Sequence, residues 1–190
     1  MPKLMIVVGS VRQGRIGLPI AEWLRREAGA DGRFEVDFVD LAERALPLMD
    51  EPNHPRLGRY THDHTIAWSR RVDAADAFLF AFPEYNHSYS PAIKNALDYL
   101  HAEWGRTPVG FPDWGGHSAG TRAQAALRPV VAVLGMVPTR ANVEINHPRE
   151  QLGSGPDGDV FEPDEHQRGV VRAQLDELAA LDAALRPLRG

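Results

Sequence analysis

The chain has 190 residues, of which 43% are hydrophobic and 25% charged, a composition typical of a globular protein with a real core. Its 21 basic and 26 acidic residues leave a net charge of −5, which argues against nucleic acid or an anionic membrane as a partner. Cysteine is absent, which excludes disulfides, thiolate metal sites and cysteine nucleophiles, so redox chemistry would need a bound cofactor.

The length predicts a single domain over residues 1–190. No apolar run approaches the roughly 20 residues of a membrane-spanning helix, and the first residues lack a signal-peptide pattern. We therefore expect a cytoplasmic protein.

Short apolar runs rich in Val, Ile or Phe predict five strands, and amphipathic patterns predict helices between and after them. The expected strands are Leu4–Val8, Phe34–Val39, Ala77–Phe82, Pro108–Phe111 and Val137–Ile145. The expected helices include Ile20–Ala28, Ile93–Leu100, Ala123–Leu134 and Val171–Leu185. This alternation favours an α/β fold, with a parallel sheet covered by helices on both faces.

Two long stretches are predicted to be irregular, because they are rich in proline or glycine. Leu41–Tyr60 carries three prolines, and Asn146–Pro163 combines glycines with Pro156 and Asp157. Long loops of this kind inside a compact domain are usually functional or mobile.

The first expected strand runs into a glycine-containing loop, Gly9–Gly17, and then into a helix. Glycines permit close approach of a ligand, and a helix N-terminus offers free N–H groups and positive potential to a phosphate. The loop has neither the Lys-Ser/Thr pair of a Walker A motif nor the G-x-G-x-x-G spacing of a dinucleotide site. It therefore predicts a site for one terminal phosphate, and the alternative is a surface turn with solvated Arg12 and Arg15.

Two further loops follow the third and fourth expected strands, at the carboxyl ends where open α/β sheets bind ligands. Pro83–Pro91 supplies tyrosines and an asparagine that suit a planar aromatic ligand, although capping of the next helix explains part of its composition. Phe111–Gly120 supplies glycines and Ser118 for close backbone approach. We expect the three loops to enclose one site.

His62-Asp63-His64 has residue types that bind metals, but no third ligand is evident, so we predict no metal site. Capping and solvent contact explain Asp63 better. Trp23 and Trp68 lie in helical patterns, where core or interface packing is the usual role of tryptophan.

Several motifs resemble the NADPH-dependent FMN reductase family, whose relatives include quinone, azo-dye and chromate reductases. The resemblance covers about residues 4–145. Its most specific part is Pro83-Glu84-Tyr85-Asn86 followed by Lys94-Asn95-Ala96. Further matches are Gly9-Ser10-x-Arg12, Leu46-Pro47-Leu48, Glu103-Trp104, Gly115-Gly116, Gly120-x-Arg122-Ala123 and Leu127-Arg128.

The resemblance implies a flavodoxin-like three-layer sandwich with a five-stranded parallel sheet in the order 2-1-3-4-5. It also implies non-covalent FMN, NADPH or NADH as electron donor, and a homodimer or homotetramer. The helix Ala92–Leu100 and the segment to Trp104 are then expected at the dimer contact, with Tyr99 and Trp104 as interface aromatics.

Carried over to this sequence, the resemblance places three sets of residues around FMN. The expected phosphate contacts are Ser10, Arg12, Arg15, Ile16 and Gly17. Pro83, Glu84, Tyr85 and Asn86 are expected along the ribityl chain and ring, and Gly115, Gly116, His117 and Ser118 at the other edge of the ring.

The sequence thus predicts an FMN-dependent NAD(P)H oxidoreductase that passes electrons to a small-molecule acceptor such as a quinone, a flavin, an azo compound or a metal oxyanion. No side chain is expected to act as a proton-transfer catalyst, because the cofactor supplies the chemistry. The alternative is a flavodoxin-like electron carrier that does not oxidise NAD(P)H. Carriers usually present a strongly acidic docking face, and the net charge of −5 is mild for that purpose.

Overall fold

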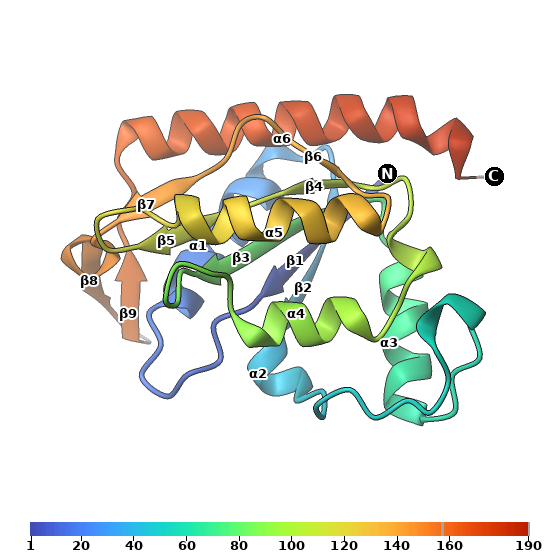
Figure 1. Cartoon of the computed structure of the whole chain (residues 1–190). Coiled ribbons are helices and arrows are strands. Elements are labelled where there is room, and N and C mark those ends of the chain that lie inside the picture. Colours follow the sequence, from blue (N-terminus) through green and yellow to red (C-terminus); the bar gives the residue numbers. More distant parts are fainter. Residues whose placement is uncertain (157, 190) are drawn as a thin grey trace.

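A parallel sheet lies at the centre of the fold in the computed structural model, which describes residues 1–156 and 158–189 (Figure 1). Its strands run in the order β2-β1-β3-β4-β6. They are β1 (Lys3–Val8), β2 (Glu35–Asp40), β3 (Ala77–Pro83), β4 (Pro108–Gly110) and β6 (Val137–Pro138). This doubly wound order is the flavodoxin-like one, and it confirms the predicted order 2-1-3-4-5.

Beyond β3, the strands β4 and β6 are each followed by a further short strand, so the expected single strand Val137–Ile145 is wrong and the sheet has more strands than the five expected. After β4 the chain resumes as β5 (Asp113–Gly115), which also pairs with β3, and after β6 it resumes as β7 (Glu144–Asn146). Pro112 and Pro138 stand at or next to the breaks, and proline has no N–H to donate to a strand ladder. The loop that we expected over Phe111–Gly120 therefore contains a short strand.

Helices cover both faces of the sheet, because β1 and β3 are apolar on both faces. Met5 and Val7 pack with α3 (Asp63–Asp73), α4 (Pro91–Asp98) and α5 (Thr121–Val133). Leu4, Ile6 and Val8 pack with α1 (Gly17–Asp31) and α6 (Glu165–Leu185). Alternate residues of one strand thus contribute to two cores, which is how a parallel strand buries both of its faces.

The aromatic residues expected at a subunit contact lie in the core instead. Tyr99 is 0% exposed and Trp104 is 1% exposed. Trp104, in the short helix η2 (Ala102–Trp104), packs edge-on against Trp68, with ring centroids 6.1 Å apart. The indole N–H groups of Trp68 and Trp104 donate to the carbonyls of Ala96 and Leu97. The prediction that Tyr99 and Trp104 present their rings to a second subunit is therefore wrong.

The two segments expected to be irregular differ in the structure. Residues 41–60 hold only the short helices α2 (Leu41–Arg44) and η1 (Pro55–Leu57). Residues 146–163 instead hold η3 (Pro148–Gln151) and an antiparallel hairpin of β8 (Leu152–Gly155) and β9 (Gly158–Phe161), so that prediction is wrong. The hairpin is ordered because Phe161 is buried against Trp23 of α1, with ring centroids 5.2 Å apart.

The last described helix is η4 (Arg186–Leu188), which follows α6. Within residues 1–156 and 158–189, none of the helices combines the length and the apolar character needed to span a bilayer.

Candidate functional site

A pocket of about 380 Å³ opens at the carboxyl ends of β1, β3, β5 and β7. We call it the carboxyl-edge pocket. Its walls are Ser10, Arg12, Arg15 and Ile16; Pro83, Glu84 and Tyr85; Trp114, Gly115 and Gly116; and His147, Pro148, Arg149 and Glu150. The structure therefore brings nine of the thirteen predicted site residues to one cavity, while Gly17, Asn86, His117 and Ser118 are not part of its lining.

The loop after β1 ends at a helix N-terminus that no side chain caps. Ile16 is the N-cap residue of α1 without a capping side-chain hydrogen bond, and the first turn of α1 contains no acidic residue. The N–H groups of a first helical turn have no partner within the helix, and they favour a bound anion. Gly17 lies directly behind the lining, since a Cβ there would come within 2.4 Å of Ser10 Cβ and 2.5 Å of Trp114 Cζ2.

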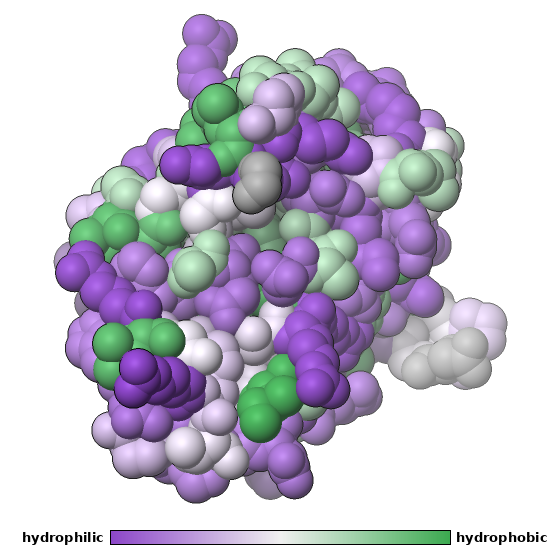
Figure 2. Space-filling view, turned by 90° about the vertical axis from the view of Figure 1, so that its right-hand side faces the viewer, coloured by the Kyte–Doolittle hydropathy of each residue, from purple (hydrophilic) through white to green (hydrophobic). Residues whose placement is uncertain are grey.

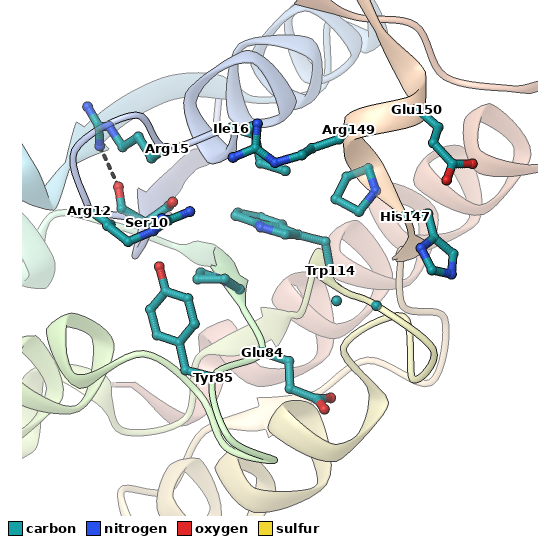
Figure 3. Close-up of a pocket in the computed structure, with 14 residues that line it drawn as sticks. Ser10, Arg12, Arg15, Ile16, Glu84, Tyr85, Trp114, His147, Arg149 and Glu150 are labelled. Carbon is teal, nitrogen blue, oxygen red and sulfur yellow. Dashed lines mark hydrogen bonds between the residues drawn. The ribbon is translucent and has the colours of Figure 1, made fainter.

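Arg15 lines the pocket, but its charged end is held by Asp40 at the end of β2. Arg15 Nη1 donates to Asp40 Oδ1 at 2.5 Å and to the carbonyl of Ser10 at 2.6 Å, and Nη2 pairs with Asp40 Oδ2. The hydrogen bond with Asp40 raises the pKa of Arg15. Figure 3 shows this guanidinium turned away from the cavity. Arg15 thus fixes the shape of the loop, while Arg12 extends into the pocket.

The loop after β1 is the first wall of the pocket, and a tight turn after β3 is the second wall. Tyr85 and Ser88 exchange backbone hydrogen bonds of 2.8 and 2.9 Å, and the two residues between them, Asn86 and His87, have φ values of 49° and 65°. This conformation turns the Tyr85 ring into the pocket (Figure 3) and leaves Asn86 at the exposed tip. Asparagine and histidine are among the residues that tolerate positive φ best.

Glu84 faces the pocket with its main chain and faces α5 with its side chain. Its carboxylate accepts a hydrogen bond from the backbone N–H of Arg122 at 3.2 Å and lies 3.5 Å from the Arg122 guanidinium. Burial raises the pKa of Glu84, but hydrogen bonds from Ser118, Ala123 and Arg122 outweigh burial and hold it below its ordinary value. The Glu84 carboxylate therefore ties the second wall to the first turn of α5, pointing away from the cavity (Figure 3).

The third wall is β5 and the glycines that follow it. Trp114 is only 3% exposed, yet its indole forms part of the cavity surface between Tyr85 and the segment His147–Glu150 (Figure 3). A Cβ on Gly116 would meet no atom within 4 Å, so the open space there is available to a ligand. His117 lies beyond the lining, with its ring edge-on to His147 at 5.5 Å.

A buried carboxyl group, Asp113, stands behind this third wall. It is 0% exposed, and its Oδ2 accepts a hydrogen bond of 3.4 Å from the side chain of Gln124. Within the described residues Asp113 Oδ1 has no hydrogen-bond partner. Burial raises the pKa of Asp113 to about 8. Gly120 has φ 99° and would place a Cβ 2.6 Å from Asp113 Cγ, so glycine is needed for this contact.

The fourth wall, His147–Glu150, is absent from the predicted site residues. The backbone N–H of His147 donates to the carbonyl of Gly115 at 3.1 Å, which fastens this segment to the third wall. Its signal in the sequence is the one that identified the other loops, namely polar residues directly after a strand. The sequence does not single out this segment, because Val137–Ile145 has the pattern of one strand that leads into a turn-rich segment.

The His62-Asp63-His64 motif lies outside this pocket. His62 and His64 stack with ring centroids 5.2 Å apart, and His64 Nε2 lies 3.0 Å from Asp50 Oδ1. Among the residues that the structure describes, no group of three or more His, Asp or Glu side chains is arranged to hold a metal ion.

The carboxyl-edge pocket suits a phosphorylated aromatic cofactor. It offers an uncapped helix N-terminus and Arg12 to a phosphate, and the side chains of Tyr85 and Trp114 to a flat ring. Its volume of about 380 Å³ falls in the range of roughly 300–1,000 Å³ that is usual for small-molecule sites. The fold and this pocket together define a flavodoxin-like protein of the kind that binds FMN.

The sequence model of the NADPH-dependent FMN reductase family matches residues 2–149, and the chain belongs to this family. An NAD(P)H-dependent FMN reductase of Schizosaccharomyces pombe is 35% identical over 156 residues, which cover 81% of this chain and 78% of the relative. A 2-hydroxy-1,4-benzoquinone reductase of a Burkholderia species is 29% identical over 191 residues, covering 94% of both chains.

A solved structure confirms the fold. The flavoenzyme NAD(P)H:(acceptor) oxidoreductase FerB of Paracoccus denitrificans superimposes with a TM-score of 0.74 and 24% identity, covering 95% of this chain and 98% of the other. The chain is therefore an oxidoreductase that uses FMN and NAD(P)H, as the motifs predicted, and the carrier alternative is not favoured.

Proposed function

We propose that this oxidoreductase holds FMN non-covalently in the carboxyl-edge pocket and passes electrons from NADPH or NADH to a small planar acceptor, with quinones as the first class to test. The supporting observation is the pairing of an uncapped α1 N-terminus and Arg12 with the aromatic side chains of Tyr85 and Trp114 around one cavity. The quinone class rests on the Burkholderia relative, whose name states a benzoquinone reductase.

The phosphate would bind at the first turn of α1, near Ser10, Arg12 and Ile16. The ribityl chain and ring would lie along Pro83–Tyr85 and the wall Trp114–Gly116. Gly17, Arg15 and the side chain of Glu84 would act by holding these walls in place, because their contacts are with the protein. The predicted contacts of Asn86, His117 and Ser118 with the cofactor stay predictions.

Bound FMN supplies the redox chemistry, by accepting a hydride from the nicotinamide and releasing electrons to the acceptor. The protein supplies position and electrostatics. Backbone N–H groups of the second and third walls would stabilise negative charge on the reduced ring, and the indole of Trp114 would exclude water from one part of the site. No side chain is proposed to transfer a proton.

Anaerobic mixing of the FMN-loaded protein with NADPH tests the proposal. We expect the flavin absorbance to bleach on the timescale of turnover and to return when a small benzoquinone is added. A flavin spectrum that NADPH and NADH leave unchanged would contradict the oxidoreductase function and support a carrier. A protein that stays colourless after incubation with FMN would contradict both.

We further propose that residues 1–190 form a single domain, and that the protein is a cytoplasmic homodimer or homotetramer with no nucleic-acid or membrane partner. The net charge of −5 supports the last point. Figure 2 shows a face on which hydrophilic side chains separate small hydrophobic groups, so a subunit interface is expected on another face. Light scattering of the purified protein measures the number of subunits, and a monomer would contradict this proposal.

A further inference from the structure

Arg149 extends into the carboxyl-edge pocket from a wall that is fastened to the rest of the site. It lies in η3, which directly follows His147, whose N–H bonds to Gly115. The N–H of Glu150 in turn donates to the carbonyl of His147 at 3.0 Å. Figure 3 shows the Arg149 side chain reaching across the cavity toward Ile16, the N-cap residue of α1.

Arg12 enters the same cavity from the opposite side. Both arginines are exposed and line the pocket, whereas Arg15 is neutralised by Asp40. Within residues 1–156 and 158–189, neither Arg12 nor Arg149 lies within ion-pair distance of a carboxylate, although Glu150 belongs to the same lining. Two positive side chains and an uncapped helix end therefore converge on one part of the cavity.

The charge of a phosphate monoester explains this arrangement. Such a group carries about −1.5 to −2 charges at neutral pH, since its second pKa is near 6. Arg12 alone compensates one of these charges, because the charge of Arg15 is already compensated by Asp40. A second cation is needed for a balanced site, and Arg149 is the side chain that reaches the N-terminus of α1 from the other wall.

We propose that Arg149 is a second phosphate-binding residue, which together with Arg12 holds the phosphate of FMN from opposite walls and selects FMN over the unphosphorylated flavin. This inference rests on the proposed function. The segment His147–Glu150 is then part of the cofactor site, and not only a connection between β7 and the β8–β9 hairpin.

The test compares the binding of FMN and of riboflavin to the apoprotein, because the two ligands share the ring and differ in the phosphate. Flavin fluorescence titrations give both dissociation constants. We expect Arg149→Gln to weaken FMN binding by about tenfold and to leave riboflavin binding within about twofold, as charge-assisted hydrogen bonds to phosphate are lost. Arg149→Lys should recover part of the loss, and Arg12→Gln should show the same ligand dependence.

Arg172→Gln is the matched control, since it removes the same charge from an exposed site on α6 where Arg172 lies 3.9 Å from Glu165. It should leave the ratio of FMN to riboflavin affinity unchanged. Thermal unfolding of each apoprotein checks that the variants fold alike.

Three results would overturn the proposal, and each leads to a different conclusion. An unchanged FMN-to-riboflavin ratio in Arg149→Gln means that Arg149 does not bind the phosphate of FMN. A higher KM for NADPH but not for NADH, with unchanged FMN affinity, assigns Arg149 to the extra phosphate of the donor. Failure of the parent protein to bind FMN rejects the proposed function itself, and this inference with it.

Discussion

A buried aspartate lies behind each of two walls of the carboxyl-edge pocket, and the two carboxyl groups have different kinds of partner. Asp40, 6% exposed, lies behind the wall at α1 and forms a two-point ion pair with Arg15. Asp113, 0% exposed, lies behind the wall at β5 and accepts a hydrogen bond from the neutral side-chain amide of Gln124. One carboxyl group is therefore paired with a cation, whereas burial raises the pKa of the other.

The difference matches what each wall is proposed to bind. The wall at α1 has to present net positive charge to a phosphate, and the Arg15–Asp40 pair shapes its loop without changing its charge. The wall at β5 is the one proposed to border the flavin ring, where a further fixed negative charge beside those of Glu84 and Glu144 would oppose reduction of the ring.

The largest loss of stability is expected from Arg15→Ala. The Arg15 and Asp40 side chains are only 16% and 3% exposed, so the variant leaves a buried carboxylate without its cation. Loss of one partner of such a pair costs about 3–5 kcal/mol in the free energy of unfolding, measured by urea denaturation of the apoprotein. The double variant Arg15→Ala with Asp40→Asn should lose less than the sum of the single losses. Strict additivity would contradict the role of the pair.

Asp113→Asn should stabilise the protein, with a gain that depends on pH. Burial raises the pKa of Asp113 from its ordinary 3.8 to about 8, so between these values the folded state binds a proton that the unfolded chain has released. The stability contributed by Asp113 is therefore complete below pH 3.8 and is lost as the pH rises to about 8.

Asparagine does not titrate, so the advantage of Asp113→Asn over the parent should grow with pH by up to about 1.4 kcal/mol per pH unit. It should level off above pH 8. Urea denaturation of both proteins at several values between pH 5 and 9 measures this difference. An advantage that stays constant or shrinks as the pH rises would show that Asp113 is ionised in the folded protein.

A smaller effect is expected from Glu84→Ala, which removes the carboxylate that accepts from the first turn of α5. Loss of a helix cap costs about 1 kcal/mol in the free energy of unfolding. Hydrogen exchange should show faster exchange at the amides of Arg122 and Ala123 than in the parent. Glu84→Gln keeps an acceptor at the same place, so its exchange rates at these amides should lie between those of the parent and of Glu84→Ala. Unaltered protection in Glu84→Ala would refute the capping role.

The wall at α1 could be predicted from the sequence because its determinants are local. Gly9, Ser10 and Gly17 stand directly between an apolar strand and an amphipathic helix, and that order alone indicates an anion site. The turn at Tyr85 could be predicted for the same reason, and by its resemblance to a known motif.

The wall at His147–Glu150 depends on contacts distant in sequence. Its position is set by the hydrogen bond from His147 to Gly115 and by the pairing of β7 with β5, neither of which leaves a periodic pattern. The Arg15–Asp40 pair is similar, since these residues meet only because β1 and β2 lie side by side with Val8 opposite Asp40. The residue types at the site can thus be predicted from the sequence, whereas the directions in which the charged side chains point cannot.

A crystal structure of the protein grown with FMN tests the central claim most directly. We predict one FMN per chain in the carboxyl-edge pocket, with its phosphate at the N–H groups of the first turn of α1 and its ring against the walls that carry Tyr85 and Trp114. FMN bound elsewhere on the chain, or an empty pocket at saturating FMN, would contradict the account.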